Sequence, residues 1–352
     1  MSEKKVRIGF VGVGGMGQAA HLKNYAINPE CEVVAIAELR PELARKVAAK
    51  YGVPRVYPDH MAMLEAEQLD GIVASQQFQR HSVLVPDLVK AKVPIFTEKP
   101  LAGNIAAGEI VLKSLADRGV THMVGYHKRS DPATVYAKAE IDRFKASGEI
   151  GKLRYVRIVI PAGDWVADGF CDTIWSSEEM PELASETPPA DMDDKIYNEQ
   201  IWFVNYYIHQ VNLMRHLLGE DYKVAYVDKN NLVIVVETAS GVTGTIEMTP
   251  FNTTREWMEE AMVAFEHGYV KLDLPAPLAA NRAGRVEVMA DPGNGATPIT
   301  TIPTLPWINA MRQQAANFVK VIKGEMQPPC TAQEAMKDLQ VARDYIRLRF
   351  GV

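Results

Sequence analysis

The sequence lacks the features that mark secreted, membrane-spanning and nucleic-acid-binding proteins. Its 352 residues include only three cysteines, and these are scattered without pairing or metal-ligand spacing, which argues against a disulfide scaffold. No apolar run approaches the roughly 18 residues of a membrane span. The opening MSEKKVRIGF has no room for a signal peptide. A formal charge of −6 offers no basic surface for nucleic acid. We therefore expect a cytoplasmic protein.

What is present is the composition of a globular protein, with 47% hydrophobic and 23% charged residues. The length is sufficient for two domains with sizeable cores.

The segment Val6 to Gly17, VRIGFVGVGGMG, is the strongest local signal. An apolar strand runs into Gly12-x-Gly14-x-x-Gly17, and the residues from Met16 to Ile27 have helical spacing. In such a turn Gly12 allows the tight bend, Gly14 lets the backbone approach a pyrophosphate and Gly17 lets the helix pack closely. The alternative is a glycine-rich turn that binds nothing. The strand, the helix and a later acidic residue favour a dinucleotide site.

Strands then alternate with helices up to Gly125, which predicts parallel crossover units and a Rossmann-type α/β domain over residues 1–125. The expected strands are 32–37, 71–75, 93–97 and 121–125, and the expected helices are 41–51, 82–91 and 105–118. Ligands of such a sheet lie beyond the carboxyl ends of its strands. We therefore expect these strand-end clusters to converge: Gly12–Met16, Glu38, Ser75–Phe78, Glu98–Pro100 and Tyr126–Arg129.

From residue 126 the pattern changes, and we expect an α+β domain over residues 126–352. A helix at 132–147 precedes a strand at 152–160. Several strands follow in succession (222–228, 231–238, 242–249, 257–266 and 269–274), with a helix at 201–218 and closing helices at 309–323 and 331–348. Between them, residues 161–194 are rich in Pro, Asp, Glu and Ser. This segment is either a substrate lid or a surface excursion that serves oligomer contacts.

Glu38 is placed to accept hydrogen bonds from adenosine ribose hydroxyls, so we expect NAD rather than NADP. Arg40 complicates the choice, because a guanidinium there can hold a 2′-phosphate; alternatively it is a solvated charge at a helix start.

Two side chains are candidates for proton chemistry. Lys99, in Thr97-Glu98-Lys99-Pro100, follows a strand directly, so its ammonium is placed to stabilise an alkoxide, with Glu98 as its partner or as a ribose contact. The alternative is a surface Glu-Lys pair. His209 shares a helix face with Asn205, which can fix its tautomer for general-base work, whereas a core histidine is the plainer interpretation. His209 and His216 lie seven apart without a nearby carboxylate at ligand spacing, so we expect no metal.

Together these motifs resemble the Gfo/Idh/MocA family of oxidoreductases over nearly the whole chain. The resemblance rests on Gly12-x-Gly14-x-x-Gly17, Ser75-Gln76-Gln77 through His81, Glu98-Lys99-Pro100, GYHKRSDP at 125–132, SGEIG at 147–151 and the helix bearing His209.

The resemblance implies that Lys99 orients substrate and cofactor, that His209 acts as acid/base and that an open, mostly antiparallel sheet in the second domain builds dimers or tetramers. Two positions depart from the family pattern. Asn205 stands where an aspartate is common, so it orients His209 without stabilising its charge. Ser75-Gln76 replaces the usual Thr-Pro.

The resulting hypothesis is an NAD-dependent oxidoreductase acting on a secondary hydroxyl of a sugar, glycoside or cyclitol, or on the matching ketone. An NAD-dependent glycosidase and a non-catalytic dinucleotide sensor are the alternatives. The expected catalytic residues are Lys99, His209 and Asn205. The expected cofactor contacts are Gly12, Gly14, Gly15, Met16, Gly17, Glu38, Arg40, Ser75, Gln76, Gln77, His81, Glu98, Lys99 and His127. The expected substrate contacts are Lys99, Tyr126, His127, Arg129, Trp165, Trp175, Asn205 and His209.

Overall fold

Six parallel strands form the first sheet, in the order β3-β2-β1-β4-β5-β6. The computed structural model describes residues 4–352. The strand order reverses at β1, whose neighbours are β2 and β4, as in a doubly wound dinucleotide fold. The strands are β1 (Val6–Val11), β2 (Cys31–Ala37), β3 (Arg55–Tyr57), β4 (Gly71–Ala74), β5 (Ile95–Glu98) and β6 (His122–Gly125).

Helices connect these strands, and their ends follow the local sequence. Pro41 opens α2 and Gly52 closes it in the left-handed region, while Asn104 caps α5 by accepting a hydrogen bond from the backbone N–H of Ala107. The first crossover begins as a π-helix, η1, and continues as α1. The elements are η1 (Gly17–Leu22), α1 (Lys23–Ala26), α2 (Pro41–Tyr51), α3 (His60–Ala66), η2 (Phe78–Arg80), α4 (His81–Leu88), η3 (Val89–Ala91) and α5 (Ile105–Arg118).

The core around β1 includes a distant part of the chain. Phe10 and Phe96 are fully buried in one cluster with Phe318 and Val319 of α9 (Ala310–Lys323). The rings of Phe96 and Phe318 lie 5.7 Å apart. A C-terminal helix thus completes the apolar core of the N-terminal sheet.

The compact units of the chain therefore do not follow one boundary at residue 125. The first unit contains the residues up to Tyr126 together with Gly169–Asn205 and Met311–Gln340. The second contains His127–Asp168, Tyr206–Ala310 and Val341–Val352. Much of the proline-rich segment expected as a lid or excursion is thus part of the first unit.

An eight-stranded sheet forms the second unit, in the order β14-β13-β12-β11-β7-β10-β9-β8. Within residues 4–352 its one parallel pair is β7–β10, and the other neighbouring strands run antiparallel. The strands are β7 (Leu153–Ala162), β8 (Tyr222–Val227), β9 (Val233–Thr238), β10 (Thr243–Asn252), β11 (Glu260–Phe265), β12 (Gly268–Asp273), β13 (Arg285–Ala290) and β14 (Ile299–Thr301). The expected fold class is confirmed.

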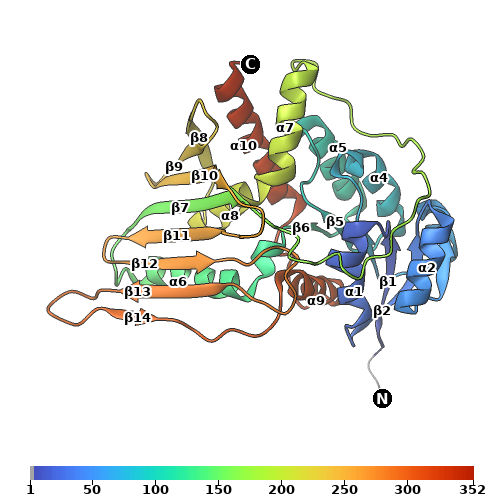
Figure 1. Cartoon of the computed structure of the whole chain (residues 1–352), viewed down its shortest axis with the longest axis horizontal. Coiled ribbons are helices and arrows are strands. Elements are labelled where there is room, and N and C mark those ends of the chain that lie inside the picture. The colour runs from blue at the N-terminus through green and yellow to red at the C-terminus, as the bar shows by residue number, and fades with distance from the viewer. Residues whose placement is uncertain (1–3) are drawn as a thin grey trace. The chain divides into compact units, whose positions relative to one another are not determined.

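One face of this sheet is covered by helices. Helix α6 (Pro132–Ser147) lies against β12 and β13, and α8 (Ile208–Leu218) lies against β7 and β10 (Figure 1). Alternate strand residues such as Val156 and Ile158 are buried. The residues between them carry polar pairs, including Arg157 with Glu247 at 2.5 Å. The remaining helices are η4 (His127–Ser130), α7 (Asp194–Tyr206) and α10 (Ala332–Phe350).

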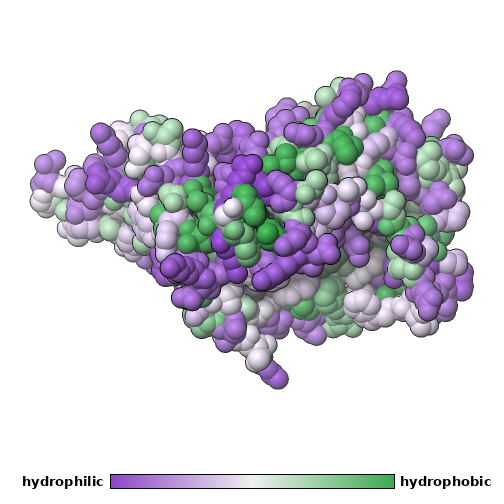
Figure 2. Space-filling view, turned by 90° about the horizontal axis from the view of Figure 1, so that it is seen from above, coloured by the Kyte–Doolittle hydropathy of each residue, from purple (hydrophilic) through white to green (hydrophobic). Residues whose placement is uncertain are grey.

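Apolar residues also reach the surface, interspersed with hydrophilic ones on the face seen in Figure 2. The most exposed large side chains include Trp307 (84%) and Trp175 (64%). Over residues 4–352, none of the helices is both long and apolar enough to cross a membrane.

The helix expected at 201–218 is instead two helices. Helix α7 begins earlier, at Asp194, and ends at Tyr206, while α8 begins at Ile208. The strands β3, β13 and β14 and the helix α3 were not predicted, because each is short or weakly patterned.

Candidate active site

The turn after β1 has the backbone that a dinucleotide-binding turn requires. Gly12 has φ +88°, and a Cβ there would lie 2.6 Å from the carbonyl oxygen of Ser75. A Cβ on Gly17 would lie 2.6 Å from the carbonyl oxygen of Gly12. At Gly14 the nearest atom to such a Cβ is Nη2 of Arg40, at 3.6 Å, so the turn stays open at this position. The cradle therefore fits a pyrophosphate approaching its main chain, with half-buried Met16 beside the start of η1.

Glu38 lies at the end of β2 and is held towards this turn. Its Oε2 accepts a hydrogen bond from the backbone N–H of Val13 at 3.0 Å. Its Oε1 accepts hydrogen bonds from the backbone N–H of Arg40 at 3.2 Å and from Arg40 Nε at 2.8 Å. The guanidinium of Arg40 thus pairs with the carboxylate. A carboxylate fixed at this strand end favours a ribose diol over a 2′-phosphate.

The cluster after β4 lies beside the turn. The backbone N–H of Ser75 donates to the carbonyl of Val11 at 3.0 Å. The Gln76 amide accepts a hydrogen bond from Arg80 at 2.8 Å, and the next residue, Gln77, is exposed.

Glu98 and Lys99, at the end of β5, are held by different partners. Glu98 Oε1 lies 2.6 Å from Nε2 of His21, and Glu98 Oε2 accepts the backbone N–H of Lys99 at 3.0 Å. Burial alone raises the pKa of Glu98, but the hydrogen bond and charge of His21, the charge of Lys99 and that N–H together hold this pKa below its usual value. Lys99 Nζ donates to the backbone carbonyl of Asn205 at 2.5 Å.

The motifs in the sequence did not point to His21. It lies in η1, four residues after Gly17, and is 1% exposed. The sequence does hold one indication of this position. His21 follows the last glycine of the turn by four residues, which places its imidazole on the first helix, next to the turn.

His81 occupies a different place from the one expected of a cofactor contact. Its ring is fully buried, with Nδ1 3.2 Å from the carbonyl oxygen of Leu101. Burial lowers its pKa to about 4, so the imidazole is neutral near pH 7. Because the ring is fully buried, a ligand cannot reach it. Its contact with the Leu101 carbonyl instead stabilises the turn that follows Lys99.

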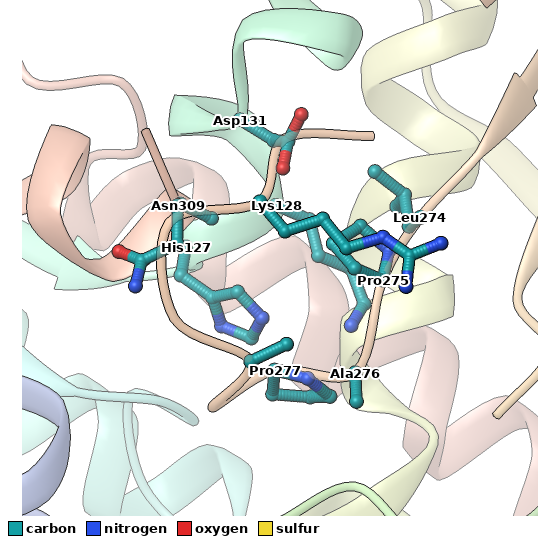
Figure 3. A pocket seen from close by; sticks show the side chains of 11 residues that line it. His127, Lys128, Asp131, Leu274, Pro275, Ala276, Pro277 and Asn309 are labelled. Atoms are coloured by element: carbon teal, nitrogen blue, oxygen red, sulfur yellow. The ribbon is translucent and has the colours of Figure 1, made fainter. Parts of the chain in front are cut away.

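In the second unit, His209 lies at the start of α8 with its ring against that of His127, the two centroids 4.9 Å apart in an edge-to-face arrangement. His127 is buried and lines a small recess. In Figure 3 its imidazole points towards Pro277. The other lining residues are Lys128, Asp131, Leu274, Pro275, Ala276, Ala279, Arg282, Asn309 and Ala310.

Lys128 and Asp131, which line this recess, are buried charged residues. Lys128 Nζ is 2.9 Å from Oε2 of Glu259, and the Gln210 amide donates to Oε1 of Glu259 at 2.6 Å. Asp131 accepts the backbone N–H groups of Ala133 and Gly284, but burial dominates and raises its pKa to about 6. Lys128 had no assigned role in the sequence analysis.

Of four further expected substrate contacts, Tyr126 and Arg129 are buried, whereas Trp165 and Trp175 are exposed. Tyr126 and Arg129 are 2% and 6% exposed, and Arg129 Nε donates to Oδ1 of Asn212 at 2.7 Å, so packing accounts for both. Trp165 is partly exposed, and its backbone carbonyl accepts from Leu278. Trp175 lies in the first unit against Gly15 of the dinucleotide turn.

Asn205 and His209 do not share one helix. The helix is interrupted at Tyr207, so Asn205 lies in the last turn of α7 and His209 in the first turn of α8. Asn205 is exposed, and the contact it makes with Lys99 uses its backbone carbonyl.

Comparison with known proteins agrees with this geometry. Residues 6–126 match the family model described as the oxidoreductase family with an NAD-binding Rossmann fold. A myo-inositol 2-dehydrogenase of Thermotoga maritima is 26% identical over 228 residues, which are 65% of this chain and 59% of that protein. An inositol 2-dehydrogenase of Acidothermus cellulolyticus is 30% identical over 151 residues, 43% of each chain. The matches thus span about half the length of these relatives.

The fold of this chain matches that of a solved structure over nearly its whole length. The crystal structure of a putative myo-inositol dehydrogenase from Sinorhizobium meliloti covers 98% of this chain with 97% of its own, at 22% identity and a TM-score of 0.67, which shows a shared fold. The dinucleotide turn and the Glu98-Lys99-Pro100 strand end both lie within residues 6–126, so this part of the chain is an NAD-binding Rossmann domain like that of the oxidoreductase family it matches.

Proposed function

We propose that this protein is an NAD-dependent dehydrogenase that oxidises a secondary hydroxyl of a cyclitol, sugar or glycoside, or reduces the corresponding ketone. The observation that carries the proposal is the position of Lys99. It directly follows β5 in the dinucleotide-binding domain, and both of its ends are held, by Glu98 Oε2 at the backbone and by the Asn205 carbonyl at Nζ. An ammonium fixed at a strand end suits a substrate oxygen that gains negative charge.

When bound, NAD supplies the nicotinamide that accepts the hydride. Glycines 12, 14, 15 and 17 and Met16 would hold the pyrophosphate, and Glu38 would hold the adenosine ribose.

The residues of the chain handle the proton and the charge. As the carbinol C–H bond breaks with its electron pair, the hydroxyl proton must leave and the oxygen becomes a carbonyl oxygen. Lys99 donates a hydrogen bond that stabilises charge on that oxygen, and His209 is the proposed acceptor of the proton. His127, packed against the His209 ring, restricts its orientation. Asn205 supports the site through its carbonyl on Lys99.

The relatives support the proposed substrate class. Both curated relatives described above are inositol dehydrogenases, which favours a polyhydroxylated ring. A panel of cyclitols, sugars and glycosides, assayed by NADH absorbance with NAD and NADP in parallel, identifies the substrate.

Variants then test the roles. We expect Lys99→Met and His209→Ala each to lower kcat by about 100-fold or more while NAD still binds. Lys90→Ala, which removes an exposed ion pair with Asp87, is the control. Wild-type turnover in both variants would refute the assignment, and a glycoside cleaved without net NADH would favour the glycosidase chemistry instead.

We also infer a homo-oligomer. The face of the second sheet opposite α6 and α8 carries half-buried side chains such as Met262 and Tyr155, which a second copy of the chain can cover. Light scattering coupled to size-exclusion chromatography measures the assembly, and a monomeric mass would contradict this inference.

A further inference from the structure

The segment Phe170–Glu178, here called the strap, lies across the dinucleotide turn within the first unit. A Cβ on Gly15 would lie 2.9 Å from Cη2 and 3.3 Å from Cζ3 of Trp175, and 3.5 Å from Cε1 of Phe170. The two strap rings themselves contact edge to face at 5.7 Å. The absence of a side chain at Gly15 thus makes room for an indole that comes from more than 150 residues along the chain.

The Gln18 side chain ties the strap to the first helix. Its Oε1 accepts the backbone N–H of Ile174 at 3.0 Å, and its Nε2 donates to the carbonyl of Ile174 at 2.9 Å and to that of Val13 at 2.8 Å. Gln18 is 1% exposed, so these hydrogen bonds are shielded from water. One buried amide therefore joins the turn, η1 and the strap at the residue next to Trp175.

The end of the strap is fixed to the start of α2. Glu178 accepts the backbone N–H groups of Glu42 and Leu43 at 3.0 and 2.9 Å, which satisfies free donors at the helix N-terminus. The Ser176 hydroxyl donates to the same carboxylate at 2.9 Å. At the other end of α2, Lys50 pairs with Asp172 at 3.2 Å. In Figure 1 the strap belongs to the yellow-green trace that runs alongside α2.

These anchors place the strap over the carboxyl ends of β1 and β2. The turn at Gly12–Met16 follows β1, whereas Glu38 and α2 follow β2. The strap contacts both groups, through Gln18 after β1 and through α2 after β2. In a doubly wound sheet this edge receives the adenosine half of the cofactor.

Trp175 has an unusual exposure for a residue held so firmly. Ile174 beside it packs against the core cluster, yet the Trp175 side chain is 64% exposed. A large aromatic ring fixed over a ligand turn with most of its surface open is a preformed contact for that ligand.

We propose that the strap is the outer wall of the NAD site and that Trp175 is a cofactor-binding residue. It contacts the bound dinucleotide at the turn and slows its release, while Gln18 and Glu178 act as positioning residues for the strap. This inference rests on the proposal that residues 12–17 hold NAD, and it assigns Trp175 to the cofactor rather than to the substrate.

The test is NAD binding measured without turnover, by isothermal titration and by stopped-flow release of NADH. We expect Trp175→Ala to raise the dissociation constant for NAD about tenfold, mainly through faster release. Glu178→Ala, which loosens the strap at a distance from the turn, should give a smaller increase in the same direction. Trp307→Ala removes an 84% exposed tryptophan of the second unit and is the matched control.

Three outcomes would count against one proposal or the other. If the wild-type protein fails to bind NAD, the proposed function fails. If it binds NAD and Trp175→Ala binds within twofold of it, the strap is not part of the site. If Trp175→Ala binds more tightly, the strap obstructs the site, and this also overturns the inference. Circular dichroism checks that each variant is folded.

Discussion

Nε2 of His21 lies 2.6 Å from Oε1 of Glu98, and the other oxygen of that carboxylate holds the backbone N–H of Lys99. The first helix after the dinucleotide turn is therefore joined through two hydrogen bonds to the proposed catalytic lysine. A neutral apolar replacement of His21 removes the partner that offsets the burial of Glu98.

We expect His21→Leu to raise the pKa of Glu98, because burial raises it and His21 is the largest opposing influence. Because its pKa is lowered, Glu98 of the wild type keeps its charge until the pH is low, and the His21–Glu98 pair persists on acidification. In the variant, the acid limb of the kcat profile should move to higher pH. Profiles that superimpose would show that the pair does not control Lys99.

Asn205→Ala should affect activity far less than His209→Ala. Lys99 contacts the backbone carbonyl of Asn205, and alanine retains that carbonyl. We expect a loss in kcat of less than about tenfold, against about 100-fold or more for His209→Ala. Equal losses in the two variants would restore the hypothesis that the Asn205 side chain orients His209.

Gly12→Ala should abolish measurable NAD binding and lower stability by about 1–3 kcal/mol. Both the φ of +88° and the approach of the Ser75 carbonyl oppose a side chain there. Gly52→Ala separates the two effects, because Gly52 has φ +68° but nothing within 4 Å of its Cβ position. It should lose about 1 kcal/mol and bind NAD normally. Titration and thermal melts of both variants provide the measurement.

Breaking the Lys128–Glu259 pair should destabilise the protein strongly. Both side chains are at most 5% exposed, so Lys128→Met leaves a buried carboxylate without its cation. The expected cost is about 3–5 kcal/mol. Lys113→Met removes one partner of the exposed Lys113–Asp117 pair and should cost less than about 0.5 kcal/mol. Urea denaturation compares the two, and equal effects would contradict the role of burial.

Stability should fall as the pH drops from about 6.5 towards 5. Burial lowers the pKa of His81 to about 4 and that of His122 to about 3, so the unfolded chain takes up protons before the folded protein does. Each group then removes up to about 1.4 kcal/mol per pH unit towards the lower end of this window, and almost nothing above pH 7.5. His122→Gln should reduce the slope, and His267→Gln, at an exposed position, is the control. Identical slopes in all three proteins would refute this account.

The dinucleotide-binding half of the fold was largely predictable, because its signals are local. Helices α2 and α5 have the expected bounds, 41–51 and 105–118, and proline, asparagine or glycine lies at their ends. A Gly-x-Gly-x-x-Gly turn after an apolar strand depends on only a dozen neighbouring residues. The resemblance drawn from these motifs agrees with the match of residues 6–126 to the NAD-binding oxidoreductase family model.

What the sequence analysis missed depends on contacts between distant residues. The break at Tyr207 falls inside a continuous helical pattern, so the spacing of Asn205 and His209 predicted one helix where the structure has two. Burial of His81 and Arg129 is likewise decided by tertiary packing. The position of Trp175 depends on Gln18, which is distant in the sequence, and on Glu178, which lies in the same irregular segment as Trp175. The individual site roles stay predictions until the variants are measured.

The core of the NAD-binding domain is closed by Phe318 and Val319, close to the end of the chain. A ribosome that has released only the first 126 residues has therefore produced a sheet with one apolar surface still uncovered. Completion of that domain must await the synthesis of α9, so the nascent chain exposes β1 and β5 for longer than a domain made of contiguous residues would. A chain truncated before α9 is accordingly expected to aggregate rather than to yield an isolated cofactor-binding domain.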